Sequence, residues 1–182
     1  MVRDPHPEGA IAHDPATLIA EHGPTLWSLC LRLCPEPEDA YQEIWEKALG
    51  AFSRFDPAGP ATLRGWLLTI AHRHLIDRHR RRSVRGVVVP LAGLSVAPEA
   101  EEALDLAARR ARLDAALARL SEPQRRVIVL HHLHGRPLEQ LAAIEGVALG
   151  TIKSRLHRGR ARLAELLADP TESRARRLGR QR

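Results

Sequence analysis

The chain has 182 residues, enough for one ordinary domain or two small ones, and 44% of them are apolar, which suffices for packed cores. Only 3% are aromatic, and alternating β-branched runs are very short, so a β-sheet is not expected and the predicted class is all-α. The sequence contains neither a membrane-length apolar span nor a disulfide framework, which predicts a cytoplasmic chain without membrane insertion.

Charge is distributed unevenly along the chain. Residues 1–68 contain 5 basic and 10 acidic side chains, whereas residues 151–182 contain 10 basic and 3 acidic ones. Between them lies a basic run opposed only by Asp77; its members are Arg73, Arg78, Arg80, Arg81, Arg82 and Arg85. Two separated basic patches suggest a long polyanion that is contacted at two places, the alternative being a solvated arginine-rich surface.

The N-terminal third predicts one helix after a mobile leader at 1–13. Asp14 is a suitable N-cap and Pro15 a suitable first helical residue, and an apolar stripe then continues to Leu33. Pro24 is a candidate kink. Cys30 and Cys34 fall on one face of this helix, where we expect them to pack as small apolar groups; a redox switch or a metal pair is the alternative.

Two further helices complete the first predicted bundle. After Pro35 and Pro37, apolar residues from Ala40 to Phe52 recur at steps of three and four, which predicts an amphipathic helix with an acidic outer face. Residues 55–60 predict a loop, because prolines and glycine break the helical hydrogen-bond ladder. Thr62 is a candidate N-cap for a third helix that runs into the arginines at 78–82, and the helical phase of Trp66 favours the core over base stacking.

A linker and a second helical unit follow. Residues 83–103 gain Pro, Gly and Ser and predict a flexible tether, although Val87-Val88-Val89 also suits a short strand. Beyond a helix ending near Leu120, Ser121 and Gln124 form a candidate capping box. The next helix is expected to bury Val127, Ile128, Leu130 and Leu133 and to end at Gly135.

The C-terminal region contains a predicted helix-turn-helix. Residues 137–144 and 149–167 have helical periodicity, small Ala142 suits their crossing, and Gly146 permits a left-handed turn. Ile152 and Leu156 would seal the second helix, which leaves donors for base edges and phosphates outside. These candidate DNA-binding residues are Thr151, Lys153, Ser154, Arg155, His157, Arg158 and Arg162. The alternative is an αα-hairpin with a solvated basic face.

Several segments resemble one known family in the correct order. Residues 150–160 (GTIKSRLHRGR) are similar to the recognition helix in region 4 of the extracytoplasmic-function (ECF, group IV) sigma factors of the sigma-70 family, and 118–125 (ARLSEPQR) to the start of that region. Residues 38–45 (EDAYQEIW) resemble region 2.2, and 54–57 with 65–71 resemble regions 2.3 and 2.4. The resemblance covers residues 15–82 and 104–167.

The resemblance implies a transcription initiation factor with three surfaces. Region 2, residues 14–82, would bind core RNA polymerase and capture the opened -10 element, and region 4, residues 104–168, would read the -35 duplex. Residues 169–182 would form a basic tail. The implied -10 contacts are Phe55, Arg64, Thr69, His72, Arg73, Arg78 and Arg80. The implied polymerase contacts are Asp39, Gln42, Glu43 and Glu46. The partners would be the clamp and flap of core polymerase, promoter DNA and an anti-sigma factor.

The sequence departs from the family pattern at two places. Ala148 stands at the usual Ser or Thr cap of the recognition helix, which forgoes about 1 kcal/mol of capping. Ala40-Tyr41 replaces the acidic-aliphatic pair of region 2.2, which leaves the detailed polymerase contacts open.

Other functions have less support in the sequence. A dimeric helix-turn-helix regulator would not explain the arginines that end the first bundle, and a protein-binding adaptor would not explain the recognition helix. The sequence lacks a phosphate-binding glycine loop and a partnered nucleophile, so neither catalysis nor a cofactor is expected. His131, His132 and His134 suggest zinc, but their spacing does not bring all three to one helix face, so no metal site is predicted.

Overall fold

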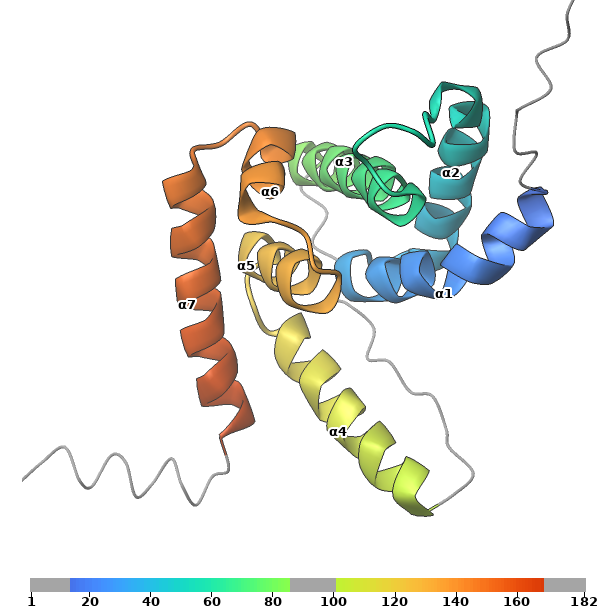
Figure 1. Cartoon of the computed structure of the whole chain (residues 1–182). Helices are drawn as coiled ribbons and strands as arrows, with labels where there is room; N and C mark the ends of the chain where they lie inside the picture. Colours follow the sequence, from blue (N-terminus) through green and yellow to red (C-terminus); the bar gives the residue numbers. More distant parts are fainter. Residues whose placement is uncertain (1–13, 86–100, 169–182) are drawn as a thin grey trace, which may run out of the picture.

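The computed structural model describes residues 14–85 and 101–168, and within these ranges every regular element is helical, which confirms the all-α prediction (Figure 1). The predicted leader at 1–13, the tail at 169–182 and the valines at 87–89 lie outside the described residues. None of the helices in the described ranges is long and apolar enough to cross a membrane.

The first bundle consists of α1 (Pro15–Leu33), α2 (Pro37–Gly50), a short 3₁₀ turn (Phe52–Arg54) and α3 (Leu63–Val84). Thr62 caps α3 as predicted, because its Oγ1 accepts a hydrogen bond from the Gly65 amide at 3.1 Å. Asp14 occupies the N-cap position of α1, but its side chain makes no capping hydrogen bond. The stripes of α1 and α2 meet α3 in a core that includes Leu29, Ile44 and Leu67, each at most 2% exposed.

The second bundle consists of α4 (Glu101–Ala118), α5 (Glu122–Ile128), a π-helical turn (Val129–Leu133), α6 (Leu138–Glu145) and α7 (Leu149–Leu167). The predicted capping box is wrong in its hydrogen bonds: Ser121 is the N-cap, but its side chain makes no cap bond. The π turn, closed by the His134 amide on the Val129 carbonyl at 3.2 Å, widens the helix and shifts its register. Leu133, predicted to be buried, is therefore 42% exposed, while His134 is 6% exposed.

A tight turn joins α6 to α7. Gly146 adopts the left-handed conformation (φ 66°, ψ 37°), which costs a glycine little because it has no Cβ, and the Val147 amide bonds back to the Ala142 carbonyl at 3.1 Å. Ile152 and Leu156, on the inner face of α7, are buried as expected. This geometry is that of the predicted helix-turn-helix and presents the outer face of α7 away from the bundle.

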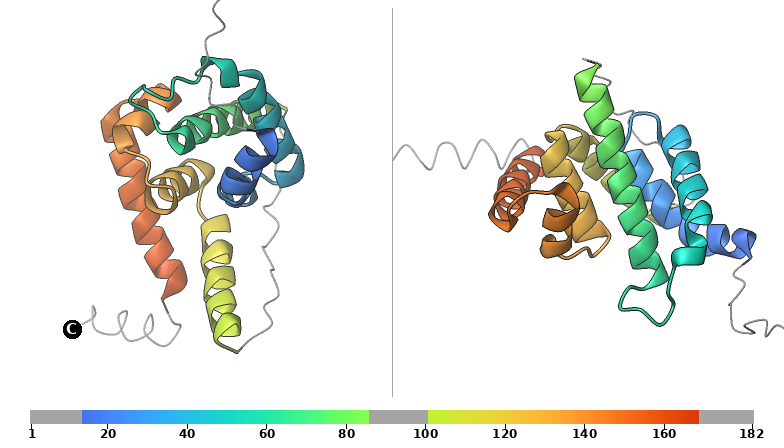
Figure 2. Two further views of the ribbon diagram at one scale, coloured as in Figure 1. Left: turned by 45° about the vertical axis from the view of Figure 1, so that its right-hand side comes forward. Right: turned by 90° about the horizontal axis from the view of Figure 1, so that it is seen from above.

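The two bundles pack against each other. Helix α3 lies between α1 and α2 on one side and α5 and α6 on the other (Figure 2, right). The buried apolar residues form one continuous cluster that extends from Leu18 in α1 to Leu156 in α7. The expected pair of helical units is thus present, but in the described residues they share a core rather than standing apart.

Candidate nucleic-acid interface

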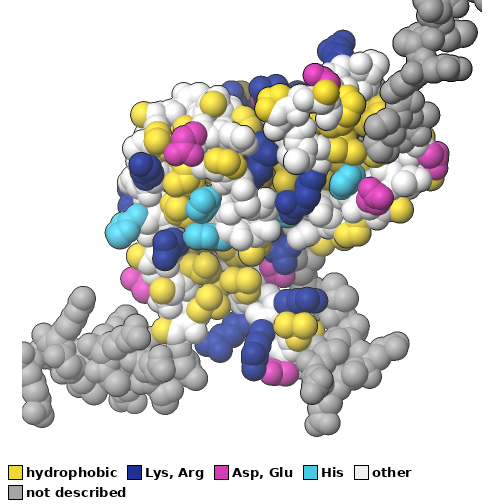
Figure 3. All heavy atoms as spheres, viewed as in Figure 1, with side chains coloured by type: hydrophobic (Ala, Val, Ile, Leu, Met, Phe, Trp, Pro, Cys, Tyr) yellow, Lys and Arg dark blue, Asp and Glu magenta, His cyan; other side chains and the backbone are white. Residues whose placement is uncertain are grey.

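The outer face of α7 carries most of the predicted duplex-reading side chains. Lys153, Ser154, His157, Arg158 and Arg162 are exposed, and Thr151 is half-buried. Only weak or surface contacts hold the basic ones: Arg158 Nε lies 3.4 Å from the Ser154 carbonyl, and Arg162 pairs with Glu165 at 2.9 Å. In the view of Figure 3, several Lys, Arg and His side chains lie along the left edge, where α7 is drawn in Figure 1, and others are scattered over the rest of this face. Exposed donors on a presented helix suit phosphates and base edges.

Arg155 differs from its neighbours because it is held inward by Glu145. Its Nη1 donates to Glu145 Oε2 at 2.6 Å, and Arg126 donates to the same carboxylate at 2.8 and 3.2 Å. His72 Nε2 of α3 lies 3.4 Å from Glu145 Oε1. Burial by itself raises the pKa of Glu145, but the contacts with His72 and Arg126 outweigh it and lower that pKa to about 2. Glu145 is therefore a buried anion between α3, α5 and α7.

The predicted -10 residues divide into an exposed and a covered group. Arg64, Arg73 and Arg80 are exposed along α3. His72 is fully buried, and burial is the main reason that its pKa is lowered, with Glu145 opposing the shift. Thr69 is half-buried, and its hydroxyl accepts a hydrogen bond from Arg136 Nη2 at 2.6 Å. The packing of the second bundle on α3 therefore leaves Arg64, Arg73 and Arg80 accessible to DNA but covers His72 and Thr69.

Arg78 points toward α2 rather than toward solvent. Its guanidinium lies 2.7 Å from Glu43 Oε1, 3.2 Å from Glu36 Oε2 and 3.7 Å from Asp39 Oδ2. Burial lowers the pKa of Arg78, but these hydrogen bonds outweigh it, so the pKa is raised. The predicted role of Arg78 at duplex phosphates therefore competes with a structural role between α2 and α3.

Phe55 and Trp66 form an aromatic cluster with Phe52 beside the loop that precedes α3. The Phe55 and Trp66 ring centroids are 5.4 Å apart, and the Phe52 and Trp66 centroids 6.1 Å apart. Trp66 is half-buried and packs against the core with one part while another remains accessible. The environment of Trp66 is thus compatible both with core packing and with base stacking, the two roles considered from the sequence.

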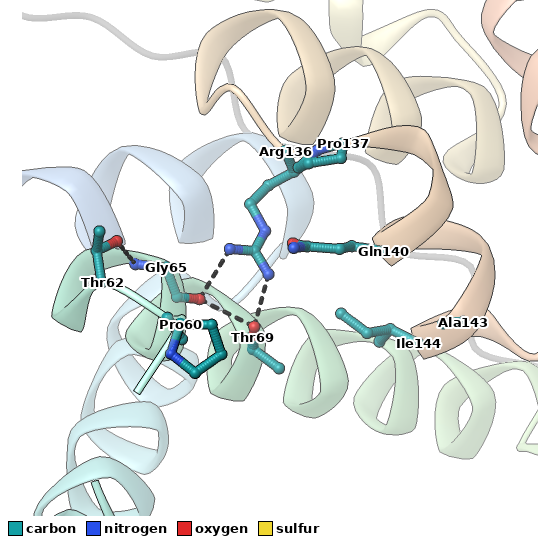
Figure 4. A pocket seen from close by; sticks show the side chains of 10 residues that line it. Pro60, Thr62, Gly65, Thr69, Arg136, Pro137, Gln140, Ala143 and Ile144 are labelled. Carbon is teal, nitrogen blue, oxygen red and sulfur yellow. Dashed lines mark hydrogen bonds between the residues drawn. The ribbon is translucent and has the colours of Figure 1, made fainter. Parts of the chain in front are cut away.

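A pocket of about 350 Å³ separates the start of α3 from α6 (Figure 4). Arg136 crosses it and donates from Nη1 to the Gly65 carbonyl at 2.9 Å, besides its bond to Thr69. Gln140 and Ile144 of α6 line the opposite side. Arg136, only 8% exposed, was not singled out by the sequence, because its partners lie about seventy residues away along the chain.

The outer face of α2 borders an apolar groove of about 530 Å³. Its lining combines apolar rings and aliphatic side chains with an acidic and amide rim: Ile19, Trp27, Glu38, Tyr41, Gln42, Trp45, Glu46 and Leu49. Two of the predicted polymerase contacts, Gln42 and Glu46, thus line the groove. The other two do not line it: Asp39 is exposed with its Oδ2 3.7 Å from Arg78 of α3, and Glu43 pairs with Arg78 and His74.

Comparisons with known proteins identify the family. The sigma-70 region 2 model matches residues 18–85, and the sigma-70 region 4 model matches residues 110–163. The ECF RNA polymerase sigma factor SigL of Mycobacterium tuberculosis is 36% identical over 161 residues, which cover 82% of this chain and 88% of SigL. The chain belongs to the ECF sigma factors of the sigma-70 family. Members of this family act in promoter-specific transcription initiation.

Other relatives agree with this assignment. The ECF sigma factor SigE of Mycolicibacterium smegmatis is 32% identical over 155 residues, and the chain spans 60% of its length. Among known structures, the sigma factor RpoE in complex with the anti-sigma factor NepR from Bartonella quintana has a TM-score of 0.64 and 31% identity, with 84% of this chain and 95% of that chain covered. CnrH in complex with the cytosolic domain of CnrY has a TM-score of 0.53 and 27% identity, with 84% and 86% covered.

The cysteines and the C-terminal histidines of this sigma factor have structural environments. Cys30 and Cys34 are both buried free thiols, and burial together with Cys34 raises the pKa of Cys30 to about 12, which suits apolar packing. His131 Nδ1 lies 2.8 Å from the Arg136 carbonyl, while His134 is buried near Arg64 and Arg32. Within the described ranges, no three side chains of the His, Cys, Asp or Glu type form a potential metal site.

Proposed function

We propose that this sigma factor binds core RNA polymerase through α2, captures the opened -10 element along α3 and reads the -35 duplex with α7. On this proposal residues 14–82 act as region 2, 83–103 as the linker and 104–168 as region 4, and the chain acts in the cytoplasm without catalysis of its own. The observation that carries the proposal is the exposed basic face of α7, presented by the left-handed turn at Gly146.

The -35 surface is supported by the chemistry of its exposed side chains. Lys153, Ser154 and Arg158 are near the N-terminal half of α7, the part that contacts base edges in helix-turn-helix proteins. Arginine and lysine donate to guanine O6 and N7, and serine to either base or phosphate. Arg155 can join them only after leaving Glu145, so we assign it a conditional role.

The -10 surface is supported by two exposed arginines on the helix face that also carries Trp66. Arg73 and Arg80 are seven residues apart on α3 and suit the phosphates of the non-template strand, whereas Arg64, also exposed, lies on the opposite side of the helix. Phe55 and Trp66 supply aromatic rings at the start of that face. Basic side chains interleaved with aromatic rings are the usual means of binding single-stranded DNA, because phosphates attract the former and bases stack on the latter.

The polymerase surface is supported by the groove beside α2. Its apolar floor includes Trp45 and Leu49, and Glu38 and Glu46 stand on its rim. A partner that buries this groove needs apolar side chains flanked by basic ones. A helical segment such as the clamp coiled coil of the largest polymerase subunit meets that need. The family resemblance adds contacts of region 4 with the flap and regulation by an anti-sigma factor.

Run-off transcription tests the proposal. Core polymerase that lacks any sigma subunit is combined with this chain and genomic DNA fragments, and transcript starts are mapped. We expect promoter-specific starts with the wild type and their loss in the double variant Lys153→Ala/Arg158→Ala, which still binds core. Arg110→Ala, which removes an exposed charge from α4, is the matched control and should transcribe normally. Absence of both specific transcripts and core binding with the wild type would refute the proposal.

A further inference from the structure

Arg155 stands at the edge of the inner face of α7. It follows the buried Ile152 by three residues and precedes the buried Gly159 by four, so its side chain leaves the helix beside the stripe that packs on the bundle. From this edge a long side chain can extend outward to DNA or inward to α6. In the structure it extends inward: Nη1 donates to Glu145 Oε2 at 2.6 Å, while Nε and Nη2 make no hydrogen bond within the described part of the chain.

Glu145 is fixed in the orientation from which it holds Arg155. Arg126 of α5 donates to Glu145 from Nε at 2.8 Å and from Nη2 at 3.2 Å, a forked contact that sets the direction of both carboxylate oxygens. The side chains of Glu145 and Arg126 are only 4% and 7% exposed, whereas that of Arg155 is 22% exposed. Of these three residues, Arg155 is therefore the one that can exchange its intramolecular partner for a DNA phosphate.

That exchange brings little net gain. Arg155 would give up a charge-assisted hydrogen bond in a largely dry site in order to make a similar one in a solvated groove. It would also leave the buried carboxylate of Glu145 with one cationic partner fewer. An exposed arginine such as Arg158, whose Nε lies 3.4 Å from the Ser154 carbonyl, has no such cost. Arg158, but not Arg155, is therefore free to add to the attraction for phosphates.

We propose that Glu145 limits the affinity of α7 for DNA of any sequence by holding Arg155 away from the phosphates. The inference rests on the proposed function, because it assumes that the outer face of α7 contacts duplex DNA. Phosphate contacts carry no sequence information, and non-promoter sites far outnumber promoters, so a lower sequence-independent affinity leaves more of the chain available to core polymerase. Glu145 is thus a positioning residue that acts through Arg155.

Binding of the full chain to a short labelled duplex of unrelated sequence tests the proposal. Affinity is measured by fluorescence anisotropy at a series of salt concentrations. We expect Glu145→Gln to bind up to about tenfold more tightly at about 0.1 M salt and to steepen the salt dependence by about 0.9 units, the value for one added phosphate contact. The double variant Glu145→Gln/Arg155→Ala should lose both gains. Glu139→Gln, which removes an exposed carboxylate from the same helix, is the matched control and should leave the salt dependence unchanged.

A second comparison keeps the test decisive if circular dichroism shows that Glu145→Gln does not fold. In the otherwise wild-type chain, Arg158→Ala should reduce the salt dependence by about 0.9 units, and Arg155→Ala by less than about half of that. Equal effects of these two variants, a folded Glu145→Gln that binds no more tightly than the wild type, or a double variant that keeps the gain would each overturn the inference. If Arg158→Ala changes neither affinity nor salt dependence, the outer face of α7 does not contact DNA, and the proposed function is contradicted instead.

Discussion

Removing the charge of Glu145 tests the buried polar cluster directly. Its side chain is 4% exposed, and its pKa is lowered from 4.5 to about 2 by Arg126 and His72 in spite of burial. A pKa that is lower in the folded chain than in the unfolded chain corresponds to about 3 kcal/mol of stability for the ionised carboxylate. Glu145→Gln also leaves Arg126 partly unpaired, so we expect it to lower the free energy of unfolding by about 3 kcal/mol at neutral pH.

Urea unfolding at a series of pH values measures this effect. Because the folded pKa is depressed, the contribution of Glu145 is complete above pH 4.5 and is lost as the pH falls toward about 2. The difference between wild type and Glu145→Gln should therefore shrink by up to about 1.4 kcal/mol per pH unit below that point. Glu165→Gln, which breaks the exposed pair with Arg162, is the control and should change stability by less than about 1 kcal/mol. A Glu145→Gln effect as small as that of the control, or one independent of pH, would refute the reasoning.

Four other outcomes are expected. Gly159→Ala should destabilise the chain by about 1 to 3 kcal/mol in urea titrations, because an added Cβ would lie 2.8 Å from Ile128 Cδ1. Gly150→Ala meets no atom within 4 Å and should stabilise α7 by up to about 1 kcal/mol, so equal effects would contradict the α5–α7 packing. Burial, together with Arg64 and Arg32, lowers the pKa of His134 to about 4, so its neutral form stabilises the fold above pH 6.5 and that stability declines from pH 6.5 toward 4. A ring titration by NMR with a midpoint near 6.5 would contradict this. Lys153→Ala should weaken binding to the -35 duplex by about 1 to 3 kcal/mol more than binding to an unrelated duplex, because its proposed contact is with a base edge, and equal weakening of both would argue against that contact.

The sequence by itself determined the helices and the family. Apolar residues at three- and four-residue steps define each buried stripe locally, and the Thr62 cap and the Gly146 turn depend on neighbours within a few residues. The motifs of regions 2 and 4 are also continuous in sequence, so their order alone predicted a sigma factor. Local predictions fail at three positions. Asp14 and Ser121 stand at N-cap positions without the expected side-chain hydrogen bond. Leu133 is exposed because the π turn shifts the helical register, which periodicity does not detect.

Only the tertiary structure decided which of the predicted contact residues are free. Arg73 and His72 are adjacent on α3 and equally suited to DNA by type, yet the first is exposed and the second is buried against α6. That difference depends on Glu145, which approaches from the other bundle with its Oε1 3.4 Å from His72 Nε2, although the two residues are far apart along the chain. Electrostatic pairing of this kind is set by three-dimensional proximity rather than by local periodicity, so the sequence predicted the surfaces and the fold determined their accessibility.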